Sequence, residues 1–565
     1  MSVDLVPCTE FPAPFHPIAC AFISDPTLCA DRFPTNARFS KAPAETLDAL
    51  RPPPSQASIG LLLQALQDST SEGELTSAQR YHLQELASGS AVAVVTGQQV
   101  GFLGGPLYIA LKAATVLTLA QRLRDLLARP VVPIFWVEDN DSDGREAGST
   151  YWWHPEGALQ WLTAGSEDEL AQPLSTFARF FPPEGIWRAA LQTIISELPG
   201  ELRELLSAAY RAGNSWSRSF TALLQWLMGH AGLLFLHASV ARRHGLFRSV
   251  VEQALFRIPQ VDAALHHGIA QLHGYGHREA IAPRQPLLYF HTTEGLRYRV
   301  RSLPTGEYAI AHRRYSTRQL RELFSQDCTA FSPSALLRPV CQDAALPTVA
   351  VVLGPTEVAY WAQLRELYEE LQVPMPVVVL RPSMTLVPPQ LQRLLDHEGW
   401  NARRFLAPWQ ELEPTFLQHL PAMQALEQLD SDLQKHLQRW YELMLHHVRN
   451  LDPTLVPSLG ATHHRIEQAL HRWERRFRAA LRRHSEVLLR HARRAWSLLY
   501  PNGQPQERLL SWLQLLVLCG TEGFREALDQ AATLPAGFHA IFTTPTATTA
   551  ASAVSSLSPT GSLPR

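Results

Sequence analysis

The sequence predicts an α/β protein in which a doubly wound parallel sheet carries an inserted connecting region and a long antiparallel helical coiled-coil arm. Short apolar runs rich in β-branched residues alternate with helical patterns, which is typical of strands buried on both faces. A glycine-rich turn separates the first such strand from a long helix. Further along the chain, apolar residues recur at spacings of three and four over two long segments, which predicts paired helices.

The clearest part of the sheet is one β-α-β unit. Ala91–Val95 is the first strand, a helical pattern runs from Leu107 to Leu127, and Val131–Val137 is the second strand. Glycines follow the first strand and acidic residues follow the second. Because ligands bind outside the carboxyl ends of parallel strands, these two loops predict a small-molecule site. The residues concerned are Gly97, Gly101, Gly104, Gly105, Glu138, Asp139 and Asp141.

The glycine turn has two interpretations. Without a Cβ, its backbone can approach a ligand closely, and amides at the start of the helix after Pro106 can bind an anion such as phosphate. Its spacing, however, matches neither G-x-G-x-x-G nor G-x-x-x-x-G-K-[ST], the standard nucleotide motifs. A tight strand-to-helix turn without a ligand is the alternative. Lys112, one of only three lysines in the chain, lies on the same helix and is either a ligand contact or a surface residue.

Composition fits a large enzyme with more than one domain. The chain has 565 residues and a formal net charge of -2, which gives no overall attraction to nucleic acid or anionic lipid. The N-terminus has no secretion-signal pattern, so we expect a cytoplasmic protein. The most apolar stretch, Ser219–Val240, contains polar residues and two glycines that split it, so we expect no membrane span. Six cysteines form no C-x-x-C pair, so we expect free thiols and no zinc site.

The remaining elements extend the sheet. We expect a hairpin that turns at Pro304-Thr305-Gly306, strands at Thr348–Leu353 and Val377–Leu380, and a helix from about Glu357 to Leu371 between those strands. The resulting segments are 1–155 (N-terminal arm and first half of the sheet), 156–330 (inserted connecting region), 331–420 (second half of the sheet), 421–499 (coiled-coil arm), 500–542 (helical return to the core) and 543–565 (a disordered Ser/Thr/Ala/Pro-rich tail).

The arm is predicted from an apolar seam. Leu426, Leu429, Leu433, Leu437, Trp440, Met444, Val448 and Leu451 are spaced by three or four. Asp452-Pro453 breaks the helix, and we expect Pro457–Gly460 to complete the turn before a second helix. The seam indicates self-association, with packing against the same chain as the alternative. The second helix is rich in arginine. These arginines either face solvent or pair with acidic residues of a partner subunit, or they bind the phosphate backbone of a nucleic acid.

Three blocks resemble one known family. They are TGQQVGFLGGPLYIALK followed by PVVPIFWVEDND, the segment from Leu336 to Val387 that contains VVLGPTEVAYWAQLRELYEEL, and LYPNGQPQERLLSW from Leu499 to Trp512. In this order they resemble the cysteine ligases of bacillithiol biosynthesis (BshC). The resemblance implies a Rossmann-like core, a coiled coil that forms a homodimer, and cysteine and glucosaminyl-malate as substrates. It also implies the last step of bacillithiol synthesis, in which an amide bond joins them.

The resemblance also implies roles for particular residues. Amide formation from a free carboxylate needs activation, so ATP is the expected cofactor, with ADP as a possible product and Mg²⁺ a possible companion. The expected catalytic residues are Glu138, Asp139 and Asp141. The expected substrate contacts are Gln98, Gln99, Glu357, Tyr360, Trp361, Arg381 and Ser383. The expected nucleotide contacts are Gly97, Gly101, Gly104, Gly105 and Lys112. Members of the family usually have a histidine where this chain has Asn140, which puts any proton-transfer or metal-binding role of that position in doubt.

Two other classes of protein are alternatives. One is a class I synthetase-like, RNA-binding protein, but its HIGH and KMSKS signatures do not occur in this chain. Tight tRNA binding that weakens steeply with salt would support that class. The other is a non-catalytic dimeric scaffold, which the Asn140 departure suggests and which binding without turnover would support. Nucleic acid and membrane are therefore not the partners we expect.

Overall fold

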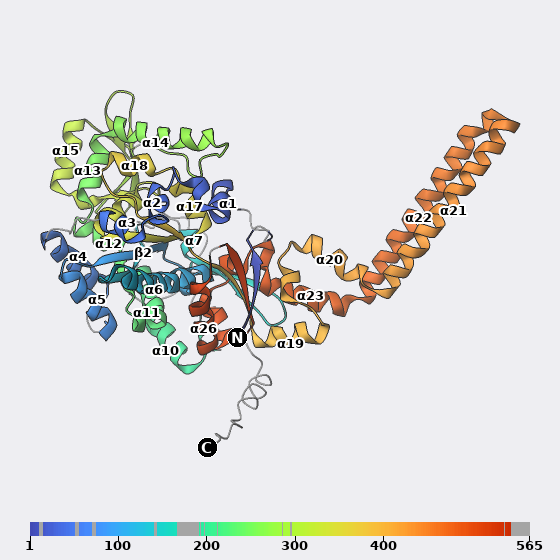
Figure 1. Ribbon diagram of the computed structural model, residues 1–565, viewed down its shortest axis with the longest axis horizontal. Coiled ribbons are helices and arrows are strands. Elements are labelled where there is room, and N and C mark those ends of the chain that lie inside the picture. The colour runs from blue at the N-terminus through green and yellow to red at the C-terminus, as the bar shows by residue number, and fades with distance from the viewer. Residues whose placement is uncertain are drawn as a thin grey trace, which may run out of the picture. The chain divides into compact units, whose positions relative to one another are not determined.

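A computed structural model of the chain (Figure 1) describes residues 1–8, 10, 15–50, 56–70, 75–140, 144–165, 191–192, 194–196, 198–211, 213–284, 286–293, 296–535 and 537–543. It divides into two compact units, of which the first contains Met1–Trp153, Leu159–Pro389 and Pro505–Arg565. The second contains His154–Ala158 and Gln390–Gln504. Residues 390–420, which the sequence led us to group with the sheet, therefore lie in the second unit, together with the arm helices. The expected disordered tail lies outside the described residues.

The core of the first unit is a five-stranded sheet in the order β13-β12-β2-β3-β6. Every neighbouring pair is parallel. The strands are β2 (Val92–Gln99), β3 (Val131–Glu138), β6 (Leu234–His237), β12 (Thr348–Leu353) and β13 (Val377–Leu380). The chain builds outward from β2 through β3 to β6, and later returns to the other side of β2 with β12 and β13. This reversal confirms the doubly wound sheet and puts its switch point between β2 and β12.

Helices cover both faces of this sheet. The helix α6 (Leu107–Leu127) contacts β2, β3 and β12, and α26 (Thr521–Thr533) packs on α6. On the other face, Ala93 and Val95 of β2 join a buried cluster with side chains of α4 (Gln56–Ser69) and α12 (Ala238–Arg243). Alternate strand residues therefore face different layers, as burial on both sides requires. The contact of α26 with α6 also shows that the C-terminal segment returns to the core.

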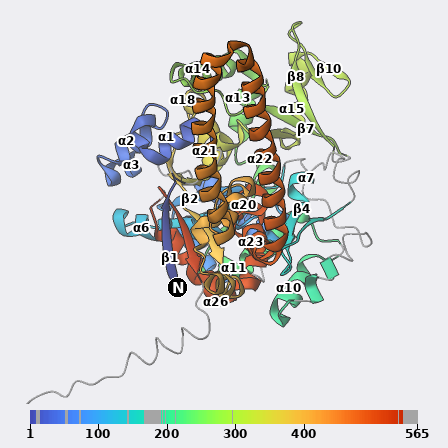
Figure 2. The same ribbon diagram turned by 90° about the vertical axis from the view of Figure 1, so that its right-hand side faces the viewer.

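The connecting region differs from the expected simple insertion. Its strand β6 belongs to the core sheet, beside β3. The hairpin at residues 304–306 is confirmed, with Gly306 at a φ of +80°. It belongs to an antiparallel sheet, ordered β10-β9-β8-β7-β11, that is visible in Figure 2. Its strands are β7 (Leu288–His291), β8 (Arg297–Ser302), β9 (Tyr308–Ile310), β10 (Arg313–Tyr315) and β11 (Phe331–Pro333).

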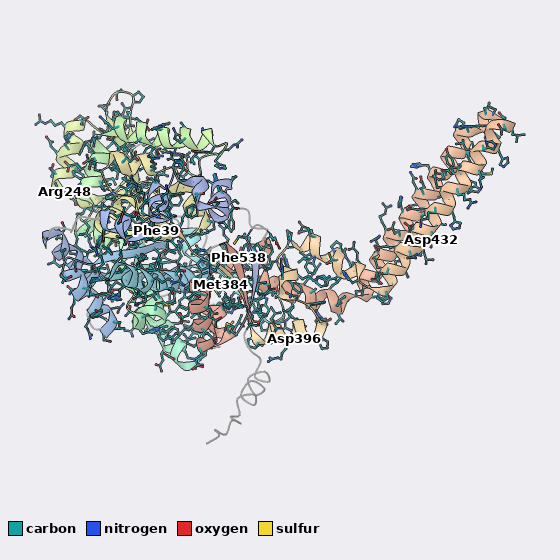
Figure 3. All side chains as sticks on the ribbon, viewed as in Figure 1. Phe39, Arg248, Met384, Asp396, Asp432 and Phe538 are labelled. Atoms are coloured by element: carbon teal, nitrogen blue, oxygen red, sulfur yellow. The ribbon has the colours of Figure 1, made fainter. Side chains whose placement is uncertain are left out.

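A smaller sheet joins the two ends of the described chain. It has the order β1-β15-β14, with β1 (Ser2–Pro7), β14 (Ser383–Val387) and β15 (Phe538–Thr543). Figure 3 shows Met384 of β14 and Phe538 of β15 close together in this sheet. The expected single helix at 357–371 is instead two short helices, α17 (Pro355–Trp361) and α18 (Arg365–Glu370).

The other helices of the first unit are α1 (Pro17–Ser24), α2 (Pro34–Phe39), α3 (Pro43–Leu50), α5 (Ser77–Ala87), α7 (Gly144–Ala147), α10 (Gly200–Ala209), α11 (Trp216–Met228), α13 (Arg248–Phe256), α14 (Ile258–Gly274), α15 (Thr317–Gln326), α16 (Arg338–Ala345), α24 (Gln506–Leu509) and α25 (Trp512–Cys519). A two-stranded antiparallel ribbon consists of β4 (Ser149–Trp153) and β5 (Leu159–Thr163). No helix in the described part of the chain is long and apolar enough to cross a membrane. All six cysteines are free thiols.

The second unit consists of helices. They are α19 (Pro389–Glu398), α20 (Trp409–Gln418), α21 (Pro421–Leu451), α22 (Val456–His484) and α23 (Glu486–Leu499). The long helices α21 and α22 pack against each other, which confirms the helical hairpin of the arm. Their connection is a short 3-10 turn at Pro453–Leu455. The expected turn at Pro457–Gly460 is wrong, because these residues already lie in α22, where Pro457 occupies the first turn and needs no intrahelical N–H bond.

The apolar seam of α21 is only partly covered by α22. Leu437 and Val448 are half-buried, whereas a second set of apolar side chains on the same helix is exposed. That exposed stripe is Leu429, Leu433, Trp440, Met444 and Leu451. Leu429 is 69% and Leu451 is 83% exposed, so the single chain leaves about half of the predicted seam uncovered.

Candidate active site

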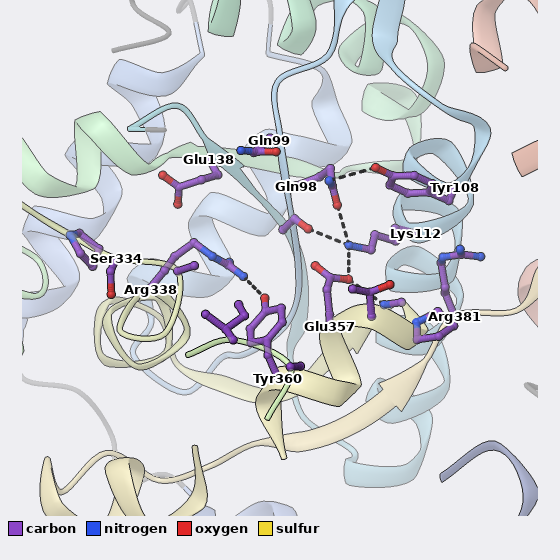
Figure 4. Close-up of a pocket in the computed structure, with 18 of the residues that line it drawn as sticks. Gln98, Gln99, Tyr108, Lys112, Glu138, Ser334, Arg338, Glu357, Tyr360 and Arg381 are labelled. Carbon is purple, nitrogen blue, oxygen red and sulfur yellow. Dashed lines mark hydrogen bonds and ion pairs between the residues drawn. The ribbon is translucent and has the colours of Figure 1, made fainter. Parts of the chain in front are cut away.

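A cavity of about 480 Å³ opens at the carboxyl ends of β2, β3 and β12, where the sheet changes direction. This volume is typical of a pocket for a small ligand. Its main polar residues are shown in Figure 4. The cavity is lined by Gly97, Gln98 and Gln99 at the end of β2, Glu138 at the end of β3, Gly354–Glu357 after β12 and Arg381 after β13, together with Tyr108, Lys112, Tyr289, Arg297, Arg338, Tyr360 and Arg508.

Lys112 lies inside the cavity wall and is only 1% exposed, so the alternative of a surface residue is wrong. Its Nζ donates to Gly97 O at 3.0 Å and to Gln98 Oε1 at 2.9 Å, and it lies 2.5 Å from Glu357 Oε2. These three acceptors take all three ammonium protons. Burial lowers the pKa of Lys112 to about 8, although Glu357 opposes that change.

Glu357 has two roles in the wall. Besides Lys112, its Oε2 accepts a hydrogen bond from Gly354 N at 2.7 Å, which caps the start of α17. A carboxylate in a first turn also suits the helix dipole. Glu357 therefore ties the loop after β12 to the helix after β2, and one side of its carboxylate still faces the cavity.

Glu138 is the acidic residue that the β3 loop presents to the cavity. Trp136 Nε1 donates to its Oε2 at 3.0 Å, and Asn140 N donates to its Oε1 at 3.1 Å. These two bonds fix the carboxylate at the end of the strand. Burial alone would lower the pKa of Arg338, but Tyr360, Glu138 and Glu357 together raise it above its ordinary value. Glu138 and Arg338 therefore bring a negative and a positive charge to the wall of the same cavity (Figure 4).

Asp139 does not belong to this site, and its expected place beside a substrate is wrong. It is 1% exposed and does not line the cavity. Ser239 N donates to Asp139 Oδ1 at 2.7 Å and Ser239 Oγ to Oδ2 at 2.6 Å, so the carboxylate stabilises the start of α12. The adjacent Asn140 is also buried and accepts a hydrogen bond from Arg242 Nε at 3.2 Å. Asp141 lies outside the described residues.

The glycine turn packs closely against other parts of the chain, and Gly97 is the member of the turn that lies at this cavity. A Cβ on Gly104 would lie 2.3 Å from the Trp512 indole, and one on Gly101 would lie 2.8 Å from Gly105 Cα. Trp512 Nε1 donates to Gly104 O, and Leu107 N, at the start of α6, donates to Leu510 O. Gly104 therefore permits close packing against the C-terminal segment, and Gly101 permits close packing within the turn itself. None of Gly101, Gly104 and Gly105 lines this cavity, whereas Gly101 lines a separate pocket of about 210 Å³.

Of the substrate contacts expected in the second half of the sheet, Tyr360 and Arg381 line the cavity, as Glu357 does. Arg338 donates to Tyr360 Oη at 2.6 Å. Trp361 is fully buried and packs against Tyr368, so its expected substrate contact is wrong. Ser383 does not line the cavity either, because its Oγ is bonded to Glu507 at 3.0 Å and to His539 at 2.7 Å.

The sequence did not predict the role of Glu507, which holds the Arg381 guanidinium in place. The two side chains form a buried ion pair with an Arg381 Nη2 to Glu507 Oε1 distance of 2.8 Å. Met384 N donates to Glu507 Oε2 at 2.7 Å. Burial would raise the pKa of Glu507, but Arg381 holds it below its ordinary value. The only sequence signal was its place in the block LYPNGQPQERLLSW.

Arg338, Arg297, Tyr289 and Arg508 were also missed, since they lie far from the β-α-β unit in sequence. With them the cavity holds five basic and two acidic side chains, the basic ones being Lys112, Arg297, Arg338, Arg381 and Arg508. Such a site suits an anionic ligand that also carries a basic nitrogen. No group of three or more His, Cys, Asp or Glu side chains in the described part of the chain could hold a metal ion.

Comparison with known proteins agrees with the fold. Residues 5–382 match the N-terminal Rossmann-like domain of bacillithiol biosynthesis BshC, and residues 384–543 match its C-terminal coiled-coil domain. Relatives named "Putative cysteine ligase BshC" come from Chlorobaculum tepidum (29% identical, over 80% of this chain and 82% of the relative) and Koribacter versatilis (30% identical, over 79% and 83%). The relative from Salinibacter ruber is 28% identical over 88% of this chain and 90% of its own.

Proposed function

Because this chain belongs to the BshC family of bacillithiol biosynthesis, we propose that it is a ligase that joins cysteine to glucosaminyl-malate through an amide bond, with the cavity as its active site. The observation that supports this most is the pairing of Glu138 with a wall of arginines at the switch point of the sheet. Glucosaminyl-malate has two carboxylates and one amine. The arginines can bind its carboxylates, and Glu138 can bind its amine.

The malate carboxylates would lie against Arg338 and Arg381. A guanidinium presents a planar fork of donors that matches a carboxylate in two bonds. Glu507 and Tyr360 keep these two guanidinium groups in place, by the ion pair and hydrogen bond described above. Because both arginines are held before a ligand arrives, less conformational entropy is lost on binding.

The sugar amine would then face Glu138. An amine attacks a carbonyl carbon only as the free base, and it must release a proton as the amide bond forms. Glu138 is held by Trp136 and the Asn140 backbone and can accept this proton at either oxygen. Gln98 and Gln99 would donate to cysteine or sugar oxygens at the end of β2.

A free carboxylate is a poor electrophile, so we also propose that ATP, accompanied by Mg²⁺, supplies the activation of the cysteine carboxylate. Phosphoryl or adenylyl transfer to one carboxylate oxygen would let the amine displace that oxygen as phosphate or AMP when the C–N bond forms. Because Gly104 is packed against Trp512, we do not place the nucleotide at the glycine turn in this proposal. Asn140 is not a residue of the cavity wall, so its difference from the usual histidine removes no group from the site. This reduces the support for a non-catalytic scaffold.

The test is amide formation by the purified chain from cysteine and glucosaminyl-malate, followed by mass spectrometry with and without ATP and Mg²⁺. Product that depends on ATP is the expected result. In Glu138→Gln, turnover should fall by about 100-fold or more, as for loss of a general base, while glucosaminyl-malate still binds in calorimetry. No product together with no substrate binding by the natural chain would disprove the proposed activity.

We further propose that the chain forms a homodimer through the arm. The exposed stripe on α21 has spacings of four and seven residues, which is the period of a coiled-coil seam. A single chain leaves this apolar surface in water, whereas a second copy would cover it.

A further inference from the structure

One face of the antiparallel sheet in the connecting region carries four arginines. Strand residues alternate between faces, so Arg297, Arg299 and Arg301 of β8 share one side. The register pairs Arg301 with Ala309 of β9, and Ala309 with Arg314 of β10, which adds Arg314 to the same side. We call Arg297, Arg299, Arg301 and Arg314 the arginine face. It lies on strands β8 and β10 (Figure 2), of which β10 is an edge strand and β8 is the central strand of this sheet.

The arginine face begins in the cavity wall. Arg297 and Tyr289 both line the cavity, with the Arg297 guanidinium 3.9 Å from the centre of the Tyr289 ring. Arg297 Nη2 also donates to Pro333 O at 3.1 Å, which fixes its position. Tyr289 is paired in register with Arg299, which is half-exposed, and Arg301 is exposed. From Arg297 to Arg301 the strand rises by roughly 13 Å. The face therefore leads from the cavity to the surface.

The positive charge of Arg299, Arg301 and Arg314 is not balanced within the described part of the chain. No ion pair there joins Arg299, Arg301 or Arg314 to a carboxylate, whereas the nearby Arg318 pairs with Glu322 at 2.9 Å. Burial lowers the pKa of Arg299, and the like charges of Arg284 and Arg301 lower it further. Like charges gathered on one sheet face destabilise the free protein, so their presence indicates an anionic ligand.

We propose that the arginine face binds a chain of linked phosphates, such as that of a nucleoside triphosphate, with one end of the ligand at Arg297 in the cavity. This inference rests on the proposed need for an activating nucleotide, and it locates the phosphates on β8 and not at the glycine turn. Successive arginines on one strand face are about 6.6 Å apart, so adjacent side chains can contact one phosphate chain together. Each guanidinium can donate two bonds to a phosphate.

The test is calorimetry on the full chain with ATP, inorganic triphosphate and AMP. The double variant R299Q/R301Q should weaken ATP and triphosphate binding by about 10-fold or more, equivalent to losing one good charge-assisted contact. R314Q should have a smaller effect in the same direction. The matched control is R313Q. Arg313 is exposed and lies on β10 beside Arg314, but its side chain points to the opposite face of the sheet. It should leave both affinities within twofold. AMP, with one phosphate, should bind more weakly than ATP.

The outcomes separate this inference from the proposed activity. The natural chain could bind triphosphate through Arg299 and Arg301 but not bind ATP. That outcome supports the arginine face and removes the nucleotide from the proposed function. Equal ATP affinity in R299Q/R301Q and R313Q overturns the arginine face but leaves the proposed function intact. The arginine face is also overturned if the natural chain binds neither ATP nor triphosphate. It is overturned as well if these arginines are needed only for binding an RNA oligonucleotide. Thermal unfolding of the free protein should be cooperative in every variant, and the midpoint of R299Q/R301Q should be no lower than that of R313Q, because two like charges have been removed from one sheet face.

Discussion

Lys112 Nζ lies 2.5 Å from Glu357 Oε2, and this ion pair joins the two halves of the core sheet at their switch point. Lys112 belongs to the helix that follows β2, and Glu357 to the helix that follows β12. Through Gly97 O and Gln98 Oε1, the same ammonium also fixes the end of β2. The cavity floor therefore depends on a charge pair between residues far apart in sequence.

Removing the carboxylate should destabilise the protein strongly. Glu357→Gln leaves the buried Lys112 ammonium without its counter-charge, and breaking a buried pair in this way costs about 3–5 kcal/mol. We expect the free energy of unfolding in urea to fall by that order. The control is Asp432→Asn, which breaks the exposed Lys435–Asp432 pair and should cost less than about 1 kcal/mol. Equal losses for the two variants would show that the Lys112 pair has no structural role.

Lys112 should also make stability depend on pH. Its pKa is about 8 when folded, below the ordinary value of 10.5, so the unfolded chain binds more protons between these pH values. Stability then rises with pH in that window, because the cost of burying the charge is relieved as Lys112 loses its proton. Below about pH 8 that cost is fully present.

The measurement is urea unfolding of the natural chain and of Lys112→Met at pH 7.5 and 9.5. The stability of the natural chain relative to the variant should increase at the higher pH, since the variant has no proton to release there. A relative stability that is unchanged, or that falls, would contradict the pKa on which this argument depends.

Asp139 should matter for stability and not for ligand binding. Asp139→Asn keeps the bond from Ser239 N but makes Ser239 Oγ accept from the new amide, so two charge-assisted hydrogen bonds at the start of α12 become neutral ones. A hydrogen bond to a charged group contributes about 1 kcal/mol more than a neutral one, so the thermal midpoint should fall. Ser239→Ala removes one of the same bonds and should destabilise in the same direction. Weaker binding of glucosaminyl-malate with unchanged stability would restore Asp139 to the site.

The order of strands and the region of the site could be predicted from local patterns. Buried strands such as Val131–Val137 have a clear apolar signature, and a strand end at the switch point is where ligands bind. The orientation of individual side chains could not be predicted in the same way. Glu138 and Asp139 are neighbours in an acidic loop, yet one faces the cavity and the other caps a helix that lies 100 residues further along.

The glycine turn is a second case in which the sequence predicted a local feature but not its neighbours. Close approach of backbone is what a glycine permits, and sequence cannot tell whether a ligand or a side chain approaches. Here the neighbour of Gly104 is Trp512, from the other end of the chain. Glu507 and Arg297 were beyond prediction for a related reason, because each is brought to the cavity by a distant element whose packing no local pattern encodes.

The arm gives the last prediction. Leu433 and Trp440 are exposed on α21 although they belong to an apolar stripe of coiled-coil period, so a partner helix is needed to remove them from water. In L433E/W440E, two charges would have to be buried in that contact, so we expect the homodimer to dissociate. Light scattering should then give the mass of one chain, 63.2 kDa.

The control is Q424E/Q428E, which adds the same charge to the same helix. Both glutamines are exposed and lie, by helical periodicity, away from the stripe. This variant should keep the mass of two chains, and circular dichroism should show equal helix content in both variants. Because the stripe does not face α22, a monomer with intact helices is expected in L433E/W440E. A dimer that persists there, or a natural chain that is already monomeric, would disprove self-association through this surface and favour a different partner for the arm.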